Sequence, residues 1–511
     1  MRTKILCFLL ALGILMSVCA CASETDTERE SGAVSDGSKM EETTADSRLD
    51  GLADDLDFGG ATVTILNHAR ANWTADEISV AKSNQEIVND AIYNRRILVE
   101  DRLHIKLENV QITGAVPDDV VEEIRRVVTI GDDKYDVSAS ACFLTMKASL
   151  DGLYHNVRNF SDIDLAKPYW SQGFNETAEY KGTQYAFTGA ALLSMYRFAF
   201  VTMFNKNLFD AYNQPYPYDT VKNGEWTMDK QAELIPIFYK DLNGNQKNDR
   251  EDQHGFINSD QIGADPYWSA CEIDIVRKDA DGVYQIVLDI AKVADVADKM
   301  LRLYYGSDGS LAYGRDSSDG EQELIRKDFA AGRAAMATMR MMEVEQGDIR
   351  NMTDRYGILP IPKFTAEQDS YRSLLHDMFT TFAIPKTLKE NREHLVGCTL
   401  EALASESYRS VTPAYYETAV KYKYMSDPES WEMLDYIYNN IYMDPGYLYA
   451  TVLDNLHSGL RDIAQSGENT VASYYKKKLG KCRKLLANDI VAKLDALKEK
   501  EVELQQKTEI F

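Results

Sequence analysis

Strand-like and helix-like segments alternate along most of this chain, and this alternation constrains the fold more than any other feature. A glycine turn followed by an apolar, β-branched run predicts a strand in FGGATVTIL (58–66). The next segment predicts a helix, because Ile87, Ala91 and Ile92 recur at helical spacing. The run YGILPIP (356–362) predicts a further strand, which its prolines end. Such alternation is typical of an α/β architecture with largely parallel sheets.

Length and charge limit the classes of protein to consider. A chain of 511 residues is too long to fold around a single hydrophobic core of ordinary size, so we expect two or more domains. The C-terminal part is predicted to be mostly helical, and we interpret its lysine-rich stretch (476–484) as a solvated helix face rather than a membrane or partner patch. The net charge of −25 argues against nucleic acid as a partner, because phosphate binding requires a surplus of Lys and Arg.

The N-terminus has the pattern of a secretory signal peptide (1–20). Two basic residues precede an apolar run of 14 residues (5–18), which is shorter than the roughly 20 residues that span a bilayer. The run ends in VCAC (18–21), which resembles a bacterial lipobox and predicts that Cys21 is lipidated. Lipidation would anchor the protein to a membrane without spanning it. An ordinary secreted protein is the alternative.

Residues 21–57 are predicted to form a disordered acidic linker. Between positions 22 and 57, twelve Asp and Glu residues stand against three Lys and Arg residues, a net charge of −9. No aromatic side chain occurs there, so this segment cannot bury enough apolar surface to order itself. We interpret it as a spacer that holds a folded body away from the lipid.

The folded body shows no pattern of an enzyme or of a cysteine-based site. The motifs G-x-S-x-G, H-E-x-x-H, G-x-x-x-x-G-K-[ST] and G-x-G-x-x-G do not occur. We therefore expect no enzyme, although the 81 acidic residues leave a glycosidase-type carboxylate pair open. The cysteines of the body are far apart and lack metal-ligand spacing, so they are predicted to be buried thiols: Cys142, Cys271, Cys398 and Cys482.

The stretch DLNGNQKNDRED (241–252) has the spacing of a calcium-binding loop. Loops of this kind take ligands from positions 1, 3, 5, 7, 9 and 12. Position 6 is Gln246 where the turn prefers glycine, and position 12 is Asp252 where glutamate is usual. We interpret the loop as a structural Ca²⁺ clip, with an Asx-rich turn without metal as the alternative. The predicted ligands are Asp241, Asn243, Asn245, Lys247 (through its carbonyl), Asp249 and Asp252.

Several motifs together resemble the extracellular solute-binding proteins, family 1, of bacterial ABC importers, in the lipoprotein branch associated with carbohydrates. They occur in the matching order from Phe58 to about Tyr447, and they include VNDAIYNRR, LAKPYWSQ, YKGTQYAFTG, TMFNKNLF, YDTVKNGEWTMDK, DRYGILPIPKF and FAIPKT. The resemblance implies a periplasmic-binding-protein-like fold of type II, in which a hinge joins two α/β lobes as in a Venus flytrap.

The resemblance also implies where the lobes begin and end. The chain would cross between them near Gly189–Tyr196 and near Phe364–Met378. The first lobe would hold 58–195 plus 376–428, and the second 196–375 plus 429–511, with the helical C-terminus. Thr227 is expected to cap the helix that WTMDK opens.

A sugar site requires aromatic platforms beside polar side chains, because sugars offer flat C–H faces and many hydroxyl groups. For each aromatic candidate, core packing is the alternative, and Trp226 and Trp170 are interpreted as structural. By matching order in the family, the candidate ligand-binding residues are Trp73, Tyr196, Arg197, Tyr267, Trp268, Arg340, His376, Asp377 and Tyr447.

The expected function follows from this resemblance. The chain would be a monomer, lipid-anchored on the extracellular face of the cell membrane, that captures an oligosaccharide or uronide and delivers it to a permease. A surface glycan-binding or sensor lipoprotein is one alternative, and a glycoside hydrolase is another.

Overall fold

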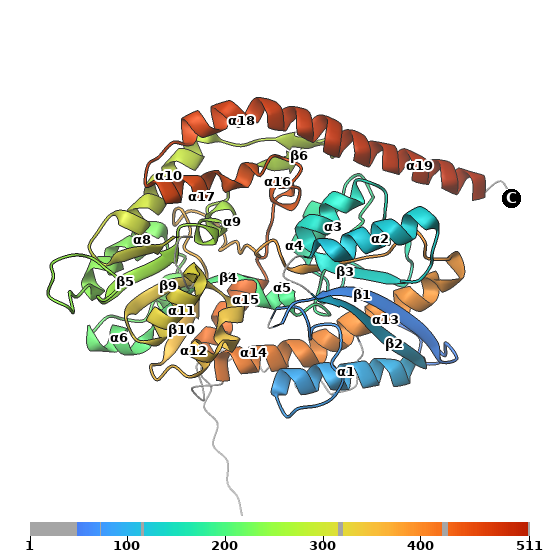
Figure 1. The fold of residues 1–511 in the computed structure, drawn as a ribbon, viewed down its shortest axis with the longest axis horizontal. Coiled ribbons are helices and arrows are strands. Elements are labelled where there is room, and N and C mark those ends of the chain that lie inside the picture. The colour runs from blue at the N-terminus through green and yellow to red at the C-terminus, as the bar shows by residue number, and fades with distance from the viewer. Residues whose placement is uncertain (1–48, 72, 114–116, 315–319, 422–427, 509–511) are drawn as a thin grey trace, which may run out of the picture. The chain divides into compact units, whose positions relative to one another are not determined.

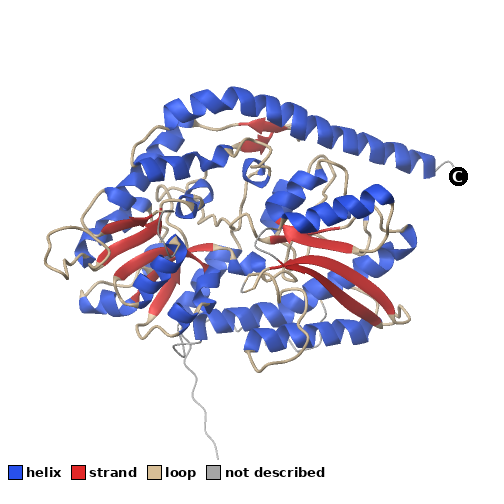
Figure 2. Ribbon diagram, in the orientation of Figure 1, coloured by secondary structure: helices blue, strands red, loops and turns tan. Residues whose placement is uncertain are grey.

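The computed structural model describes residues 49–71, 73–113, 117–314, 320–421 and 428–508 (Figure 1). The predicted signal peptide, Cys21 and most of the predicted linker lie outside these residues. No helix in the described ranges is long and apolar enough to cross a membrane. The strands form two main sheets with helices packed around each (Figure 2), and we call each sheet with its helices a lobe.

The first lobe is built on a four-stranded sheet in the order β11-β3-β1-β2. β1 pairs in parallel with β2 and β3, whereas β11 pairs antiparallel with β3. The strands are β1 (Ala61–Ala69), β2 (Ile105–Thr113), β3 (Val137–Ala141) and β11 (Thr380–Ala383). The helices of this lobe are α1 (Ile87–Leu103), α2 (Asp118–Ile130), α3 (Cys142–Ser149), α4 (Gln172–Ala178), α13 (Glu393–Glu406) and α14 (Thr412–Lys421).

The second lobe is built on a five-stranded sheet in the order β10-β4-β9-β5-β8. Its strands are β4 (Phe200–Asn205), β5 (His254–Ser259), β8 (Ser310–Tyr313), β9 (Ala334–Arg340) and β10 (Tyr356–Leu359). Its helices are α6 (Lys206–Ala211), α7 (Tyr218–Lys222), α8 (Met228–Leu234), α9 (Pro266–Ala270), α10 (Ile290–Tyr305), α11 (Glu321–Ala330), α12 (Gly347–Arg350) and α15 (Pro428–Tyr438).

Both sheets are mixed, so the prediction of largely parallel pairing holds only in part. β5 pairs in parallel with β8 and β9, but β4 pairs antiparallel with β9 and β10. Two of the antiparallel strands join their sheets just after the chain passes from one lobe to the other. β4 follows the short helix α5 (Ser194–Arg197), and β11 follows the segment 360–379. The crossings expected near Gly189–Tyr196 and Phe364–Met378, and the lobe boundaries that they define, stay a prediction.

Local sequence explains individual elements. Asp289 caps α10, because its side chain accepts hydrogen bonds from the backbone N–H groups of Ala291 and Lys292 at 3.0 and 3.1 Å. Thr227 caps α8 as predicted, accepting from Lys230 N at 3.2 Å. The four body cysteines are free and buried, also as predicted.

The C-terminal helices contact both lobes (Figure 1). They are α16 (Pro445–Leu448), α17 (Gly459–Ser466), α18 (Val471–Leu485) and α19 (Ala492–Thr508). The hairpin of β6 (Val276–Lys278) and β7 (Tyr284–Ile286) packs against α16 and against the segment between α18 and α19. α18 packs on α10 of the second lobe. α19 reaches the first lobe, where Lys181 Nζ lies 2.8 Å from Asp495 Oδ1 and Lys498 Nζ donates to the Lys181 carbonyl at 2.6 Å. The predicted second lobe (429–511) therefore includes a helix that also contacts the first.

Candidate ligand-binding site

Trp73 lies in the turn after β1, at the carboxyl end of that strand, and meets two arginines. The guanidinium carbon of Arg70 is 3.5 Å from the centre of the indole ring, and that of Arg340 is 4.9 Å away. Arg340 is the last residue of β9 in the second lobe. Cations over an indole face are attracted by its quadrupole, so Trp73 brings a loop of the first lobe against a strand end of the second.

His376 and Asp377 lie in the segment between β10 and β11, where the His376 ring approaches that of Trp73. The His376 ring is 6.3 Å from that of Trp73, in an edge-on arrangement, and its Nδ1 is 3.6 Å from Asp377 Oδ1. Burial lowers the pKa of His376 well below its usual range, and the nearby charge of Arg340 adds to this. Burial raises the pKa of Asp377 to about 6. The imidazole is therefore neutral at physiological pH.

The C-terminal helices complete the cluster. Tyr447 of α16 stacks edge-on against His457, with ring centres 5.3 Å apart. Arg461 of α17 makes a buried ion pair with Asp265, with Nε 2.6 Å from Oδ1. Its charge also acts on Asp377 and on Tyr447. We call the following residues the central cluster: Arg70, Trp73, Asp265, Arg340, His376, Asp377, Tyr447, His457 and Arg461.

Several buried polar atoms of the central cluster have no hydrogen-bond partner among the described residues. They are His376 Nδ1, Tyr447 Oη, Arg340 Nε and His457 Nδ1. Buried polar groups are normally hydrogen-bonded, and the exceptions call for an explanation. Here the atoms gather beside an aromatic ring, which is the arrangement that a polyhydroxylated ligand requires. The site residues themselves remain a prediction.

Five of the nine predicted residues belong to the central cluster: Trp73, Arg340, His376, Asp377 and Tyr447. Trp268 is buried next to it, since its Nε1 donates to the His457 carbonyl at 2.9 Å. Tyr267 is also buried, and Tyr196 packs against Tyr415, Tyr416 and Tyr438 away from the cluster. For these three aromatics the structure shows the packing contacts of the alternative interpretation.

Arg197 holds two segments together instead of facing the cluster. It donates to both Asp76 oxygens at 2.7 and 3.0 Å, to both Glu345 oxygens at 3.0 and 2.9 Å, and to the Trp73 carbonyl at 3.1 Å. These contacts use all five N–H donors of the guanidinium. Arg197 therefore positions the Trp73 turn, and it has no free donor for a ligand in this conformation.

A cavity of about 510 Å³ adjoins this ion-pair network, within the usual range of ligand pockets. One side is formed by 75–89 of the first lobe and the other by 344–350 of the second. Its polar lining is made of carboxylates, amides and guanidinium groups: Asp76, Asn84, Glu86, Asn89, Arg197, Glu345, Gln346 and Arg350. The cavity thus lies between the two lobes, next to the turn that carries Trp73.

Sequence analysis missed Arg70, Asp265, His457 and Arg461. A charged residue in a loop or on a helix is usually solvated, and nothing in the local pattern of these four distinguishes them. Arg461 could have been noticed only by its place on an amphipathic helix, where Leu460 and Ile463 are buried on either side.

The predicted calcium loop has a conformation that suits a turn of this kind. Gln246 has a φ of 61°, the left-handed geometry that made glycine the preferred residue at this position. Asp241 accepts from Gln246 N at 2.9 Å and also from Gly244 N at 2.6 Å. Asp252 is buried and already accepts from Leu242 N, Asp249 N and Tyr239 Oη, which makes it the weakest ligand of the set. Calcium at this loop stays a prediction.

No family model and no curated relative matches the sequence. Solved structures do match. An ABC substrate-binding protein from Listeria monocytogenes in complex with cycloalternan is 12% identical, with 84% of this chain and 99% of that one covered and a TM-score of 0.55. UgpB from Mycobacterium tuberculosis in complex with glycerophosphocholine is 14% identical, with 84% and 100% covered and the same TM-score.

A sugar transporter protein from Rhizobium etli in an open conformation is 14% identical, with 83% of this chain and 99% of that one covered and a TM-score of 0.55. Identities this low speak for the fold alone. The resemblance drawn from the sequence motifs is confirmed at that level: the chain has the two-lobed α/β fold of the solute-binding proteins of ABC transporters, with a helical C-terminus.

Proposed function

We propose that this chain is an extracellular solute-binding protein that captures a carbohydrate at the central cluster and delivers it to the permease of an ABC importer. In this proposal Cys21 is lipidated after removal of residues 1–20, and the acidic segment that follows is the tether. The protein acts as a monomer and performs no covalent chemistry.

The observation that carries the proposal is the combination of Trp73 with unpartnered buried polar atoms. A sugar ring stacked on the indole would take the place of a guanidinium group that lies over it in this conformation. The buried atoms of His376, Tyr447 and Arg340 are hydrogen-bonding groups without a partner in the described chain. A hydroxyl-rich ligand would satisfy both requirements at once, because one face of a pyranose is apolar and its rim is polar.

The position of the cluster supports a binding protein with two states. Trp73 belongs to the first lobe and Arg340 to the second, and a ligand between them would contact both. Only a ligand with different affinities for the open and closed forms shifts the balance between them. The closed form is then the state that a permease would recognise.

Arg70 favours an acidic sugar within this class. Its guanidinium lies over Trp73 and has no carboxylate partner among the described residues, whereas Arg340 and Arg461 are paired with Glu343 and Asp265. Burial lowers the pKa of Arg70, with a smaller contribution from the charge of Arg340, so a ligand carboxylate would relieve the repulsion between these two cations. A uronide is the sugar that supplies one.

A thermal-shift screen of the full chain tests this proposal against neutral oligosaccharides, uronides and short peptides. A ligand at 100 times its Kd stabilises the folded state by about 2.7 kcal/mol. We expect uronides to raise Tm most, and Arg70→Gln to reduce that rise while the exposed-arginine control Arg355→Gln leaves it unchanged. Peptides as the only stabilising class would refute the carbohydrate assignment.

A glycoside hydrolase is the second candidate, and one observation favours it. A general acid needs a carboxyl group that stays protonated near neutral pH. Burial raises the pKa of Asp377 to about 6; the positive charge of Arg461 opposes this rise, and the negative charge of Asp265 adds to it. Chromatographic detection of products from oligosaccharides, lost in Asp377→Asn, would replace the transport proposal with this one.

A further inference from the structure

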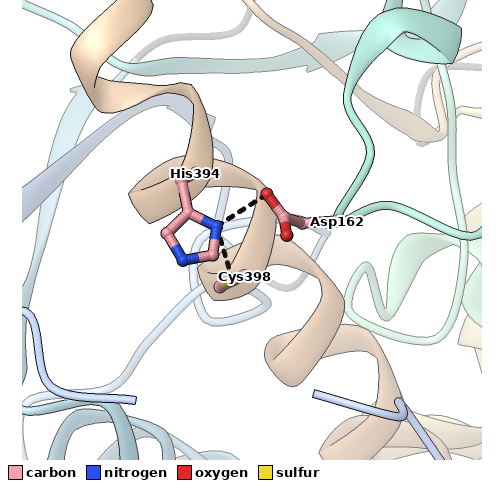
Figure 3. A group of neighbouring side chains, drawn as sticks. All are labelled: Asp162, His394 and Cys398. Carbon is pink, nitrogen blue, oxygen red and sulfur yellow. Dashed lines mark hydrogen bonds and ion pairs between the residues drawn. The ribbon is translucent and has the colours of Figure 1, made fainter. Parts of the chain in front are cut away.

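Three side chains that could bind a metal ion, none of them part of the central cluster, lie together in the first lobe (Figure 3). His394 and Cys398 are one helical turn apart on α13, so their side chains share a face of that helix. Asp162 comes from the loop before α4, more than two hundred residues earlier in the chain. The His394 Nδ1 atom is 3.0 Å from Asp162 Oδ2 and 3.6 Å from Cys398 Sγ.

These separations suit a tetrahedral metal ion. Zinc binds thiolate sulfur at about 2.3 Å and imidazole nitrogen or carboxylate oxygen at about 2.1 Å, which places ligand atoms about 3.4–3.8 Å apart. The three ligand atoms of this cluster all lie within 4.8 Å of one another. Across the residues that the structure describes, no other three His, Cys, Asp or Glu side chains meet this condition. The two separations from His394 Nδ1, 3.0 and 3.6 Å, lie within a few tenths of an ångström of the tetrahedral values.

The loop that carries Asp162 is fixed against α13. Glu401, buried one turn beyond Cys398, accepts hydrogen bonds from Asp164 N at 3.3 Å, from Trp170 Nε1 at 2.9 Å and from the Tyr169 hydroxyl. Gly397 allows the close approach, because a Cβ atom there would lie 2.9 Å from the Asp162 Cβ. The carboxylate is thus held beside the other two ligands before any ion binds.

An ordinary His–Asp hydrogen bond with a bystander thiol is the simpler explanation. The chain offers a comparison for it: His104 Nδ1 is 2.7 Å from Asp57 Oδ1, and both side chains are exposed. That pair has no third ligand among the described residues. At the cluster the His394 side chain is also exposed, but Asp162 is only 21% exposed and the buried Cys398 thiol occupies the third corner. Phe58 packs edge-on against the His394 ring, with ring centres 5.3 Å apart. The imidazole orientation is therefore set by packing as well as by Asp162.

We propose that Asp162, His394 and Cys398 bind a transition-metal ion of the zinc class, with a fourth position open to water. Thiolate and imidazole ligands select zinc over calcium or magnesium, which prefer oxygen ligands. The carboxylate, the neutral Nδ1 and the thiolate each donate an electron pair to the ion, and the proton of Cys398 is released to solvent. Because a thiol must be deprotonated to bind the ion, the metal must displace the proton of Cys398.

Co²⁺ is the probe for this site, because a cobalt–thiolate bond gives a charge-transfer band in the near ultraviolet. The full chain in detergent should bind one Co²⁺ with this band, and Zn²⁺ should remove it. Cys398→Ser should abolish the band, Asp162→Asn should weaken Co²⁺ binding at least tenfold, and the matched control His104→Gln should change nothing. Gly397→Ala keeps all three ligands and should also weaken binding, because it displaces Asp162.

Two results would overturn the proposal. One is the lack of a cobalt–thiolate band in the full chain. The other is a band of equal strength in Cys398→Ser, which would assign the band to another cysteine of the chain. Circular dichroism of each metal-free variant separates loss of a ligand from loss of the fold, and Cys398→Ala serves as the second variant if the serine form is unfolded.

Discussion

Glu77 is a fully buried carboxyl group that joins three distant segments of the chain. Its Oε2 accepts a hydrogen bond from the backbone N–H of Ser194 at 2.9 Å, and its Oε1 accepts one from the Thr380 hydroxyl. Glutamine has the same shape, stays neutral at every pH and can still accept from Ser194. Glu77→Gln therefore imitates the protonated side chain and isolates its contribution to stability.

The expected effect depends on pH, and its sign follows from the pKa. Burial is the largest influence on Glu77 and raises its pKa from 4.5 to about 7, although hydrogen bonds from Thr380 and Ser194 oppose it. The folded state thus binds the proton more tightly than the unfolded state does. The resulting stability is fully present below pH 4.5 and is lost as the pH rises through about 7. The difference between the two pKa values corresponds to about 3 kcal/mol.

Urea unfolding of the full chain at pH 5 and at pH 8 measures this effect. We expect Glu77→Gln to be more stable than wild type by only about 1 kcal/mol at pH 5 and by about 3 kcal/mol at pH 8. The control Glu108→Gln, at an exposed position on β2, should have the same free energy of unfolding as wild type at both pH values. A difference between wild type and Glu77→Gln that is the same at both pH values would refute the reasoning.

Three further changes test other parts of the structure. Arg197→Met leaves the Asp76 and Glu345 carboxylates without their cation and should cost about 3 kcal/mol in urea unfolding; unchanged stability would show that the network is not structural. Gly255→Ala should destabilise the folded state by about 1–3 kcal/mol, because a Cβ would overlap the Ile235 carbonyl oxygen. The control Gly480→Ala lies in open space on α18 and should stabilise the folded state by up to about 1 kcal/mol. Chelation with EDTA should lower Tm if the 241–252 loop binds calcium, and Asp241→Asn should remove that response. Equal melting curves with and without EDTA would favour the alternative interpretation of the loop as an Asx-rich turn without metal.

Much of the fold could be predicted because its signals are local. The Thr227 cap, the strand at 356–359 and the buried cysteines each follow from a few neighbouring residues. The pairing of β11 with β3 could not be predicted, since it joins residues about 240 positions apart and leaves no local pattern. The mixed character of both sheets arises from such long-range pairs.

The residues of the candidate site also fall into those with a local sequence signal and those without one. Trp73 and Arg340 were candidates because Trp73 lies in the turn after a strand and Arg340 ends one, and functional side chains of an α/β fold gather at such strand ends. Their role in binding stays a prediction. Arg461 and Asp265 could not be predicted, because their buried ion pair exists only through the packing of α17 against the second lobe. The Asp162, His394 and Cys398 group was missed for a related reason: cysteine spacing alone contains no metal signal, and the carboxylate comes from a remote loop.

Calorimetric titration of the full chain with the most stabilising saccharide tests the central claim most directly. Wild type should bind one ligand per chain, and Trp73→Ala should weaken binding by at least about 2 kcal/mol, or about thirtyfold in Kd, as expected for a tryptophan at the centre of a binding site. Trp431→Ala, which removes a partly exposed tryptophan outside the central cluster, should bind like wild type. Equal affinity in wild type and Trp73→Ala would contradict the assignment of the ligand to the central cluster.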